Sequence, residues 1–158
     1  APFKIFTFVY QFAGNFIRVL APRFSSFDTK EKAKMFALKS FGIVILMTFA
    51  LIVLAVFGTI LVSLVFGDDY AASAQIFRVL SLGFIFFFAG TVPSAIILYY
   101  LGKSQIVFIL TLIKIFIFAL LLYYLVPKMQ AIGAAVSYSI AEGVTFLLLA
   151  IYSLWRLK

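Results

Sequence analysis

The chain has 158 residues, of which 66% are hydrophobic and only 11% charged, and its formal net charge is +8. Soluble domains are about half apolar, so this chain has too little polar material to cover a water-soluble core, and we expect a lipid bilayer around it. Cysteine and histidine are both absent, which excludes disulfides, thiol nucleophiles and an imidazole base, and we predict neither a cofactor nor a metal site.

Hydrophobic runs long enough to cross a bilayer recur along the whole chain. Hydrocarbon about 30 Å thick needs roughly 20 apolar residues at helical rise. We therefore predict an all-α fold, a polytopic bundle of about five transmembrane helices. The predicted spans are residues 3–20, 41–66, 75–101, 105–126 and 131–154.

The first predicted helix carries a polar stripe. Its polar residues recur every three or four positions, and phenylalanines occupy other faces. Facing lipid, each polar group would cost several kcal/mol, so we expect the stripe to face protein or a water-filled cavity. The alternative is a seam packed against a helix outside this chain, with Lys4 and Arg18 extending to the two membrane surfaces. The stripe consists of Lys4, Thr7, Gln11, Asn15 and Arg18.

Arg78 enters the third predicted helix with Gln75 and Ser81 on the same face. Two interpretations are open: the guanidinium extends to the outer headgroups, or it lines a cavity. We include Arg78 among the candidates for a substrate cavity.

The last two predicted helices each contain one charged residue near the middle, Lys114 and Glu142. Counting about 1.5 Å per residue from the helix ends places the two within about one turn in depth, on antiparallel neighbours, so they can pair. A buried pair would be structural, because removing one partner leaves an uncompensated charge. In a cavity they would instead be an anion contact and its modulator, or Glu142 would be a proton-coupling carboxylate.

Basic residues gather in the first and third loops and at the C-terminus, whereas the second loop is acidic. Because Lys and Arg are retained in cytoplasmic loops, we predict a cytoplasmic C-terminus and a first residue outside, with Lys128 in the fourth loop as the exception. Charge confined to short loops also argues against nucleic-acid binding. The basic residues are Arg23, Lys30, Lys32, Lys34, Lys39, Lys103, Arg156 and Lys158, and the acidic ones are Asp68 and Asp69.

Four local patterns, separated by membrane helices, carry a family resemblance. They are Pro22 with the basic stretch after it, Phe66-Gly67-Asp68-Asp69-Tyr70, Leu101-Gly102-Lys103 and Ile132-Gly133-Ala134-Ala135. In this order they resemble the C-terminal region of polysaccharide-biosynthesis membrane proteins of the Wzx type, in the multidrug/oligosaccharidyl-lipid/polysaccharide exporter superfamily. The resemblance spans essentially the whole chain.

The resemblance implies a multi-pass flippase of the cell membrane, which moves an undecaprenyl-pyrophosphate-linked oligosaccharide to the outer leaflet. The five helices would be the last five of twelve, the C-terminal lobe of a two-bundle transporter, and the chain a fragment that lacks the N-terminal bundle. Its partners would be the bilayer, the lipid-linked glycan and that missing bundle. The two bundles would enclose a cationic cavity, to which we assign Gln11, Asn15, Arg18, Arg78 and Lys114, with Glu142 as a coupling residue or ion-pair partner.

Three other functions compete with this one. An ion-coupled exporter of small amphiphilic compounds on the same architecture would need an acidic cavity, whereas the intramembrane charges here are mostly basic. A membrane transferase or phosphatase would need clustered carboxylates or a nucleophile with its base, and the sequence has no such cluster, so we predict no enzyme. In a structural membrane subunit the polar stripe would be an assembly seam.

Overall fold

The computed structural model describes residues 2–58, 60, 64 and 73–157, and it contains helices with no strand among those residues. The predicted all-α fold class is confirmed. Asp68 and Asp69, on which the acidic second loop rests, lie outside the described residues. The elements are α1 (Pro2–Ser25), α2 (Lys30–Val56), α4 (Ser73–Ala95), the π-helical turn η2 (Ile96–Tyr100) and α5 (Ser104–Leu157).

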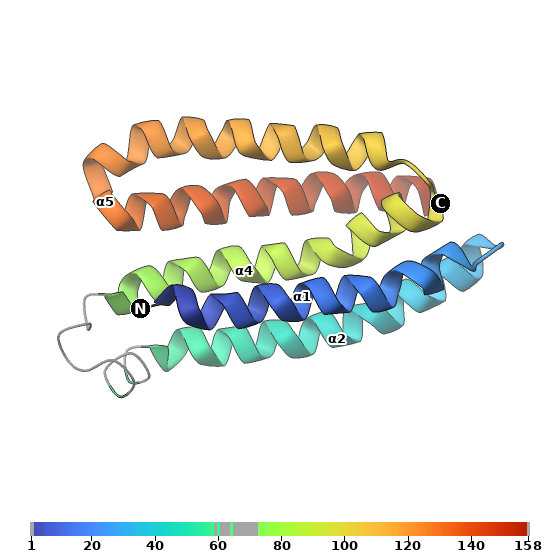
Figure 1. Ribbon diagram of the computed structural model, residues 1–158, viewed down its shortest axis with the longest axis horizontal. Coiled ribbons are helices and arrows are strands. Elements are labelled where there is room, and N and C mark those ends of the chain that lie inside the picture. The colour runs from blue at the N-terminus through green and yellow to red at the C-terminus, as the bar shows by residue number, and fades with distance from the viewer. Residues whose placement is uncertain (1, 59, 61–63, 65–72, 158) are drawn as a thin grey trace.

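The longest element, α5, is two helical arms that lie side by side (Figure 1). They meet at Gln130, whose φ of 49° and ψ of −128° interrupt the helix. We call residues 104–129 the first arm and residues 131–157 the second arm. This reversal turns one continuous apolar stretch into two antiparallel rods, which correspond to the last two predicted helices.

Among the described residues, three helices have the length and apolar composition needed to cross a membrane: Lys30–Val53, Ala74–Tyr100 and Ser104–Leu157. The folded α5 is long enough for two passes, because a bilayer needs roughly 20 residues of helix. α1 is not in this set, since the polar stripe lowers its mean hydropathy. These features support a membrane protein.

The first two helices extend beyond the predicted apolar spans. α1 continues through Pro22 to Ser25, and α2 begins at Lys30, well before the predicted start at residue 41. Bilayer thickness limits only the apolar part of a helix, so its ends can project into the headgroup region or water. The lysines in the first turns of α2 are exposed, as expected for charged side chains in the headgroup region or water.

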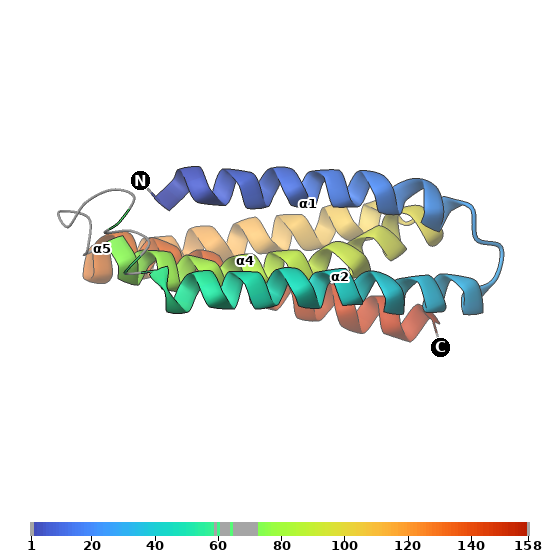
Figure 2. The same cartoon turned by 90° about the horizontal axis from the view of Figure 1, so that it is seen from below.

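α4 is the central helix of the bundle. Figure 1 shows it between the arms of α5 and the helices α1 and α2, and Figure 2 shows α1 and α2 on the two sides of it. Its residues form one apolar core with α1 and α2. The buried members of this core are Ala13, Phe16, Leu20, Phe24, Ala37, Val44, Phe88, Val92, Ala95 and Ile96.

α4 and the second arm of α5 approach closely because small residues line their interface. A Cβ atom at Gly83 would lie 2.6 Å from the Tyr138 ring. Ser139 Oγ donates a hydrogen bond to the Val79 carbonyl of α4 at 2.8 Å. Close contact between helices through small residues is typical of membrane bundles.

Candidate functional site

The polar stripe of α1 faces away from the rest of the described chain. Gln11, Asn15 and Arg18 are exposed, whereas Ala13 and Phe16 on the opposite side are buried in the core. Helical periodicity separates the two faces. The stripe therefore forms an uncovered polar surface on an apolar bundle, and the side chain of its first member, Lys4, lies outside the described residues.

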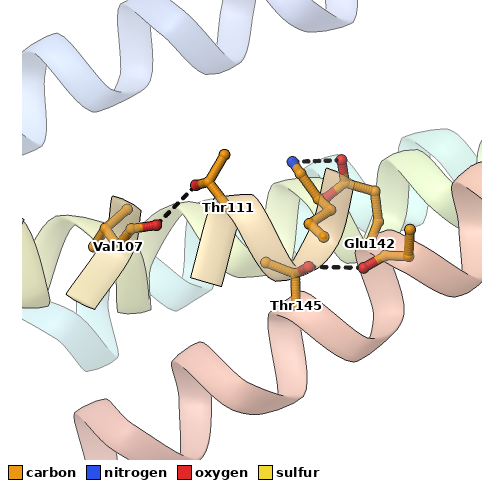
Figure 3. Close-up of polar contacts among 6 residues, drawn as sticks. Val107, Thr111, Glu142 and Thr145 are labelled. Atoms are coloured by element: carbon orange, nitrogen blue, oxygen red, sulfur yellow. Dashed lines mark hydrogen bonds and ion pairs between the residues drawn. The ribbon is translucent and has the colours of Figure 1, made fainter. Parts of the chain in front are cut away.

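The two intramembrane charges meet across the arms of α5. Lys114 Nζ on the first arm lies 3.0 Å from Glu142 Oε1 on the second arm (Figure 3). The reversal at Gln130 makes this contact possible, since it brings residues 28 positions apart to the same depth. The Glu142 side chain is 6% exposed and that of Lys114 is 26% exposed. The carboxylate is thus enclosed, while part of the lysine faces open space.

Threonines lie one turn from each partner of this ion pair. Thr111 donates a hydrogen bond to the Val107 carbonyl at 2.8 Å, and Thr145 donates one to the Ala141 carbonyl at 2.7 Å (Figure 3). Each hydroxyl is thereby satisfied by its own helix, yet its oxygen keeps lone pairs that can accept hydrogen bonds from a ligand or water.

Two cavities flank the ion pair, and Lys114 and Glu142 line both. The first has a volume of about 110 Å³ and lies between α1, α4 and the two arms of α5. The second has a volume of about 180 Å³ and is lined by Tyr10, Phe118 and Tyr138. A water molecule takes up about 30 Å³ in the liquid, so each cavity has room for several waters.

α1 carries both the stripe and two residues that line these cavities. Ile17 lines the first cavity and Tyr10 lines the second, and each is the immediate neighbour in sequence of a stripe residue, Arg18 or Gln11. α1 therefore borders the ion pair through a face next to the stripe, while Gln11, Asn15 and Arg18 themselves are exposed and line neither cavity.

Arg78 lies apart from the ion pair and its two cavities. It is exposed on α4 and lines a separate cavity of about 410 Å³, formed with residues of α2 and otherwise apolar. No residue of that cavity lines either of the two beside the ion pair. The face of α4 that carries Arg78 is turned toward α2, and this rotation separates it from the other candidates.

Several polar residues near the ion pair were missed in the sequence. Thr91, Ser94 and Thr145 line the first cavity, and Tyr138 lines the second. Their helical spacing from Glu142 was a signal for Tyr138 and Thr145, four residues before it and three after it. Nothing in the local sequence pointed to Thr91 or Ser94, because their approach to α5 depends on packing between helices.

The described residues include no group of three or more aspartate, glutamate, histidine or cysteine side chains that could hold a metal ion. The candidate site instead contains the exposed guanidinium of Arg18, the amide side chains of Gln11 and Asn15, and the Lys114–Glu142 ion pair beside two cavities. Such groups bind and orient polar or anionic ligands.

Comparisons with known proteins give two curated relatives. One is "Capsular polysaccharide biosynthesis protein CapF" of Staphylococcus aureus, 28% identical over 140 residues that cover 86% of this chain and 35% of the relative. The other is "Putative O-antigen transporter" of Shigella flexneri, 29% identical over 134 residues that cover 84% of this chain and 32% of the relative. No family model matches the chain, and no solved structure matches it.

The chain thus spans about a third of the length of these two relatives. Their similarity extends over most of the chain. Both relatives support the relationship to Wzx-type polysaccharide flippases to which the sequence motifs pointed.

Proposed function

We propose that this chain, as a relative of polysaccharide transport proteins, is part of a membrane flippase. It translocates a lipid-pyrophosphate-linked oligosaccharide for the biosynthesis of a surface polysaccharide. The observation that carries this proposal is the uncovered stripe of Gln11, Asn15 and Arg18 on a bundle whose other exposed faces are largely apolar.

The chemistry of the stripe fits such a substrate. Asparagine and glutamine side chains both donate and accept hydrogen bonds, as recognition of sugar hydroxyl groups requires. An arginine fork holds two oxygen atoms of a phosphate group at once. Polar groups in this position would be costly against lipid, so they are expected to line a water-filled path.

The rest of the transporter belongs to the proposal as well. The relatives are about two and a half times as long as this chain, which leaves room for a second bundle that would cover the stripe from the other side. The path would then run between two bundles in the cell membrane. Undecaprenyl pyrophosphate is the carrier that the family resemblance implies, and we place the C-terminus in the cytoplasm.

The test is complementation of a flippase-deficient strain by the full-length protein, scored as surface polysaccharide per unit of membrane-inserted protein. We expect Arg18→Ala to lower transport by about tenfold to a hundredfold, because a charge-assisted hydrogen bond contributes roughly 1.5–3 kcal/mol. Arg18→Lys should lower it less, since lysine keeps the charge without the fork geometry.

Arg23→Ala is the matched control. Arg23 is exposed on the same helix, near its end and beyond the stripe, and its loss should leave transport unchanged. Full transport by Arg18→Ala at normal membrane abundance would refute the substrate role of the stripe. Loss of abundance in both Arg18→Ala and Arg18→Lys would instead favour an assembly seam.

A further inference from the structure

The two members of the ion pair differ in their surroundings. Glu142 is enclosed, and Lys114 is the more exposed partner. Both line the two cavities, so a ligand that enters either cavity can reach the ammonium group. The ammonium has three N–H donors, of which one is directed to Glu142 Oε1 at 3.0 Å. Within the described part of the chain, the remaining two have no protein acceptor.

A purely structural role explains this pair poorly. The two arms are already covalently joined at Gln130. The second arm also contacts α4 through the hydrogen bond from Ser139 to the Val79 carbonyl. Buried ion pairs are in general no more stabilising than apolar residues of similar volume, because the desolvation of two charges offsets their attraction. Lysine within a membrane span does, however, require a counter-ion whenever no anionic ligand is present.

Tyr138 supplies a second, independent observation. It lies one turn before Glu142 on the second arm, and its buried hydroxyl has no partner in full hydrogen-bond geometry among the described residues, although the Tyr10 side chain lies close to it. It lines the same 180 Å³ cavity as the ion pair. A buried hydroxyl without a partner is uncommon and costly. It is a donor that a carboxylate released from Lys114 can use.

We propose that Glu142 is a built-in counter-ion, which holds Lys114 in the empty transporter and is displaced from it by the diphosphate group of the substrate, with the Tyr138 hydroxyl receiving the released carboxylate. This inference rests on the proposed function, because it assigns Lys114 to an anionic group of that substrate. Binding then exchanges one charge pair for another, so Lys114 is compensated both before and after the ligand arrives. The exchange also makes the site selective for ligands with enough negative charge to compete with a carboxylate.

The experiment measures the dissociation constant of inorganic pyrophosphate by calorimetry, using the full-length protein in lipid nanodiscs. Glu142→Gln keeps the shape of the side chain and removes the competing charge, so pyrophosphate should bind at least about fivefold more tightly, within the usual range of coupling between sites. Tyr138→Phe keeps the ring contacts with Phe84 and Phe118. It should weaken binding in the wild-type background and have no effect in the Glu142→Gln background.

The double variant Lys114→Met with Glu142→Gln is the folding control, because it leaves neither charge uncompensated. It should be as thermally stable as wild type and should bind pyrophosphate at least about fivefold more weakly than Glu142→Gln alone. Unchanged or weaker pyrophosphate binding by folded Glu142→Gln would overturn the proposal. Pyrophosphate binding by the double variant as tight as that of Glu142→Gln would also overturn it.

These outcomes are separate from the test of the proposed function. If pyrophosphate affinities follow the expected order but the full-length protein fails to complement a flippase-deficient strain, the counter-ion exchange stands and the assigned transport reaction is wrong. If complementation succeeds and the Glu142→Gln affinity is unchanged, the flippase proposal stands and the exchange is wrong.

Discussion

Buried hydroxyl groups in α5 are bonded mainly to their own helix. Ser137 Oγ donates to the Gly133 carbonyl at 2.7 Å, and Thr145 Oγ1 donates to the Ala141 carbonyl at 2.7 Å. Such bonds satisfy a polar group within its own helix, so it can be buried among apolar neighbours at little cost. Ser139 differs, because its hydroxyl lies near both the Ala135 carbonyl of its own helix and the Val79 carbonyl of α4.

We therefore expect Ser139→Ala to destabilise the bundle more than Ser137→Ala. Both serines are buried, but the bond to Val79 crosses between helices, and interhelical hydrogen bonds in membranes contribute about 0.6 kcal/mol on average and about 1.7 kcal/mol at most. Thermal unfolding of the full-length variants in detergent measures the difference. Equal unfolding temperatures for the two variants would show that the bond to α4 adds nothing to stability.

At the scale of the element, the reversal of α5 determines the geometry of the site. Gln130 adopts a positive φ of 49°, a conformation uncommon for residues other than glycine. Three residues later, Gly133 lies against the end of the first arm, where a Cβ atom would come within 2.5 Å of the Leu125 carbonyl oxygen. The reversal is tight because this position has no side chain.

Gly133→Ala should open this reversal. The obstructing atom belongs to the backbone, so it cannot rotate away as a flexible side chain would, and overpacking of this kind costs about 1–3 kcal/mol. Because the reversal aligns the two arms, we expect a lower unfolding temperature together with reduced complementation.

Gly42→Ala is the matched control for this substitution. Gly42 is helical, and a methyl group added there would meet no neighbouring side chain or other helix within 4 Å. Alanine is also the better helix former by about 1 kcal/mol. The substitution should leave stability unchanged or raise it slightly. A stability loss of the same size in both variants would contradict the steric explanation for Gly133.

At the scale of the whole molecule, the surface separates into apolar and polar faces. Exposed large apolar side chains cover α2 and the two arms of α5, as expected where lipid is the surrounding solvent. α1 is the helix with an exposed polar stripe. Examples of the exposed apolar residues are Ile45, Leu46, Phe49, Phe108, Phe116, Leu120, Leu147, Ile151 and Leu154.

The two ends of the bundle also differ in charge. The α1–α2 connection, the start of α5 and the C-terminus lie at one end, and the reversal of α5 lies at the other (Figure 1). The first end has four basic residues near the ends of α1, α2 and α5, namely Arg23, Lys30, Lys103 and Arg156, whereas Lys128 lies beside the reversal. Lysine and arginine favour the cytoplasmic side, so we expect this end to lie in the cytoplasm.

Cysteine labelling in intact cells tests this orientation. The chain has no cysteine of its own, and both Ser26, between α1 and α2, and Met129, at the reversal of α5, are exposed. In a full-length protein with any other cysteines replaced, Met129→Cys should react with a membrane-impermeant reagent. Ser26→Cys should react only after the cells are opened. The reverse pattern would invert the orientation and weaken the proposed direction of transport.

The sequence by itself determined the all-α class, the apolar character that a membrane requires and the polar stripe of α1. These properties are local: helical periodicity fixes which residues share a face, and bilayer thickness fixes how many apolar residues a span needs. Counting residues from the ends of the last two predicted helices also placed Lys114 and Glu142 at similar depths in the membrane. Their contact depends on the reversal at Gln130, which lies in the loop predicted between residues 126 and 131.

Only the tertiary structure decided which candidates lie together. Arg78 is separated from the ion pair because α4 turns that face toward α2, while Thr91, on another face of the same helix, lines a cavity beside Lys114. The Tyr138 ring packs against α4 at Gly83, and the hydroxyl of the same side chain is buried. The rotation of a helix about its axis depends on the shapes of its neighbours, which are distant in sequence, and periodicity within one helix contains no information about them.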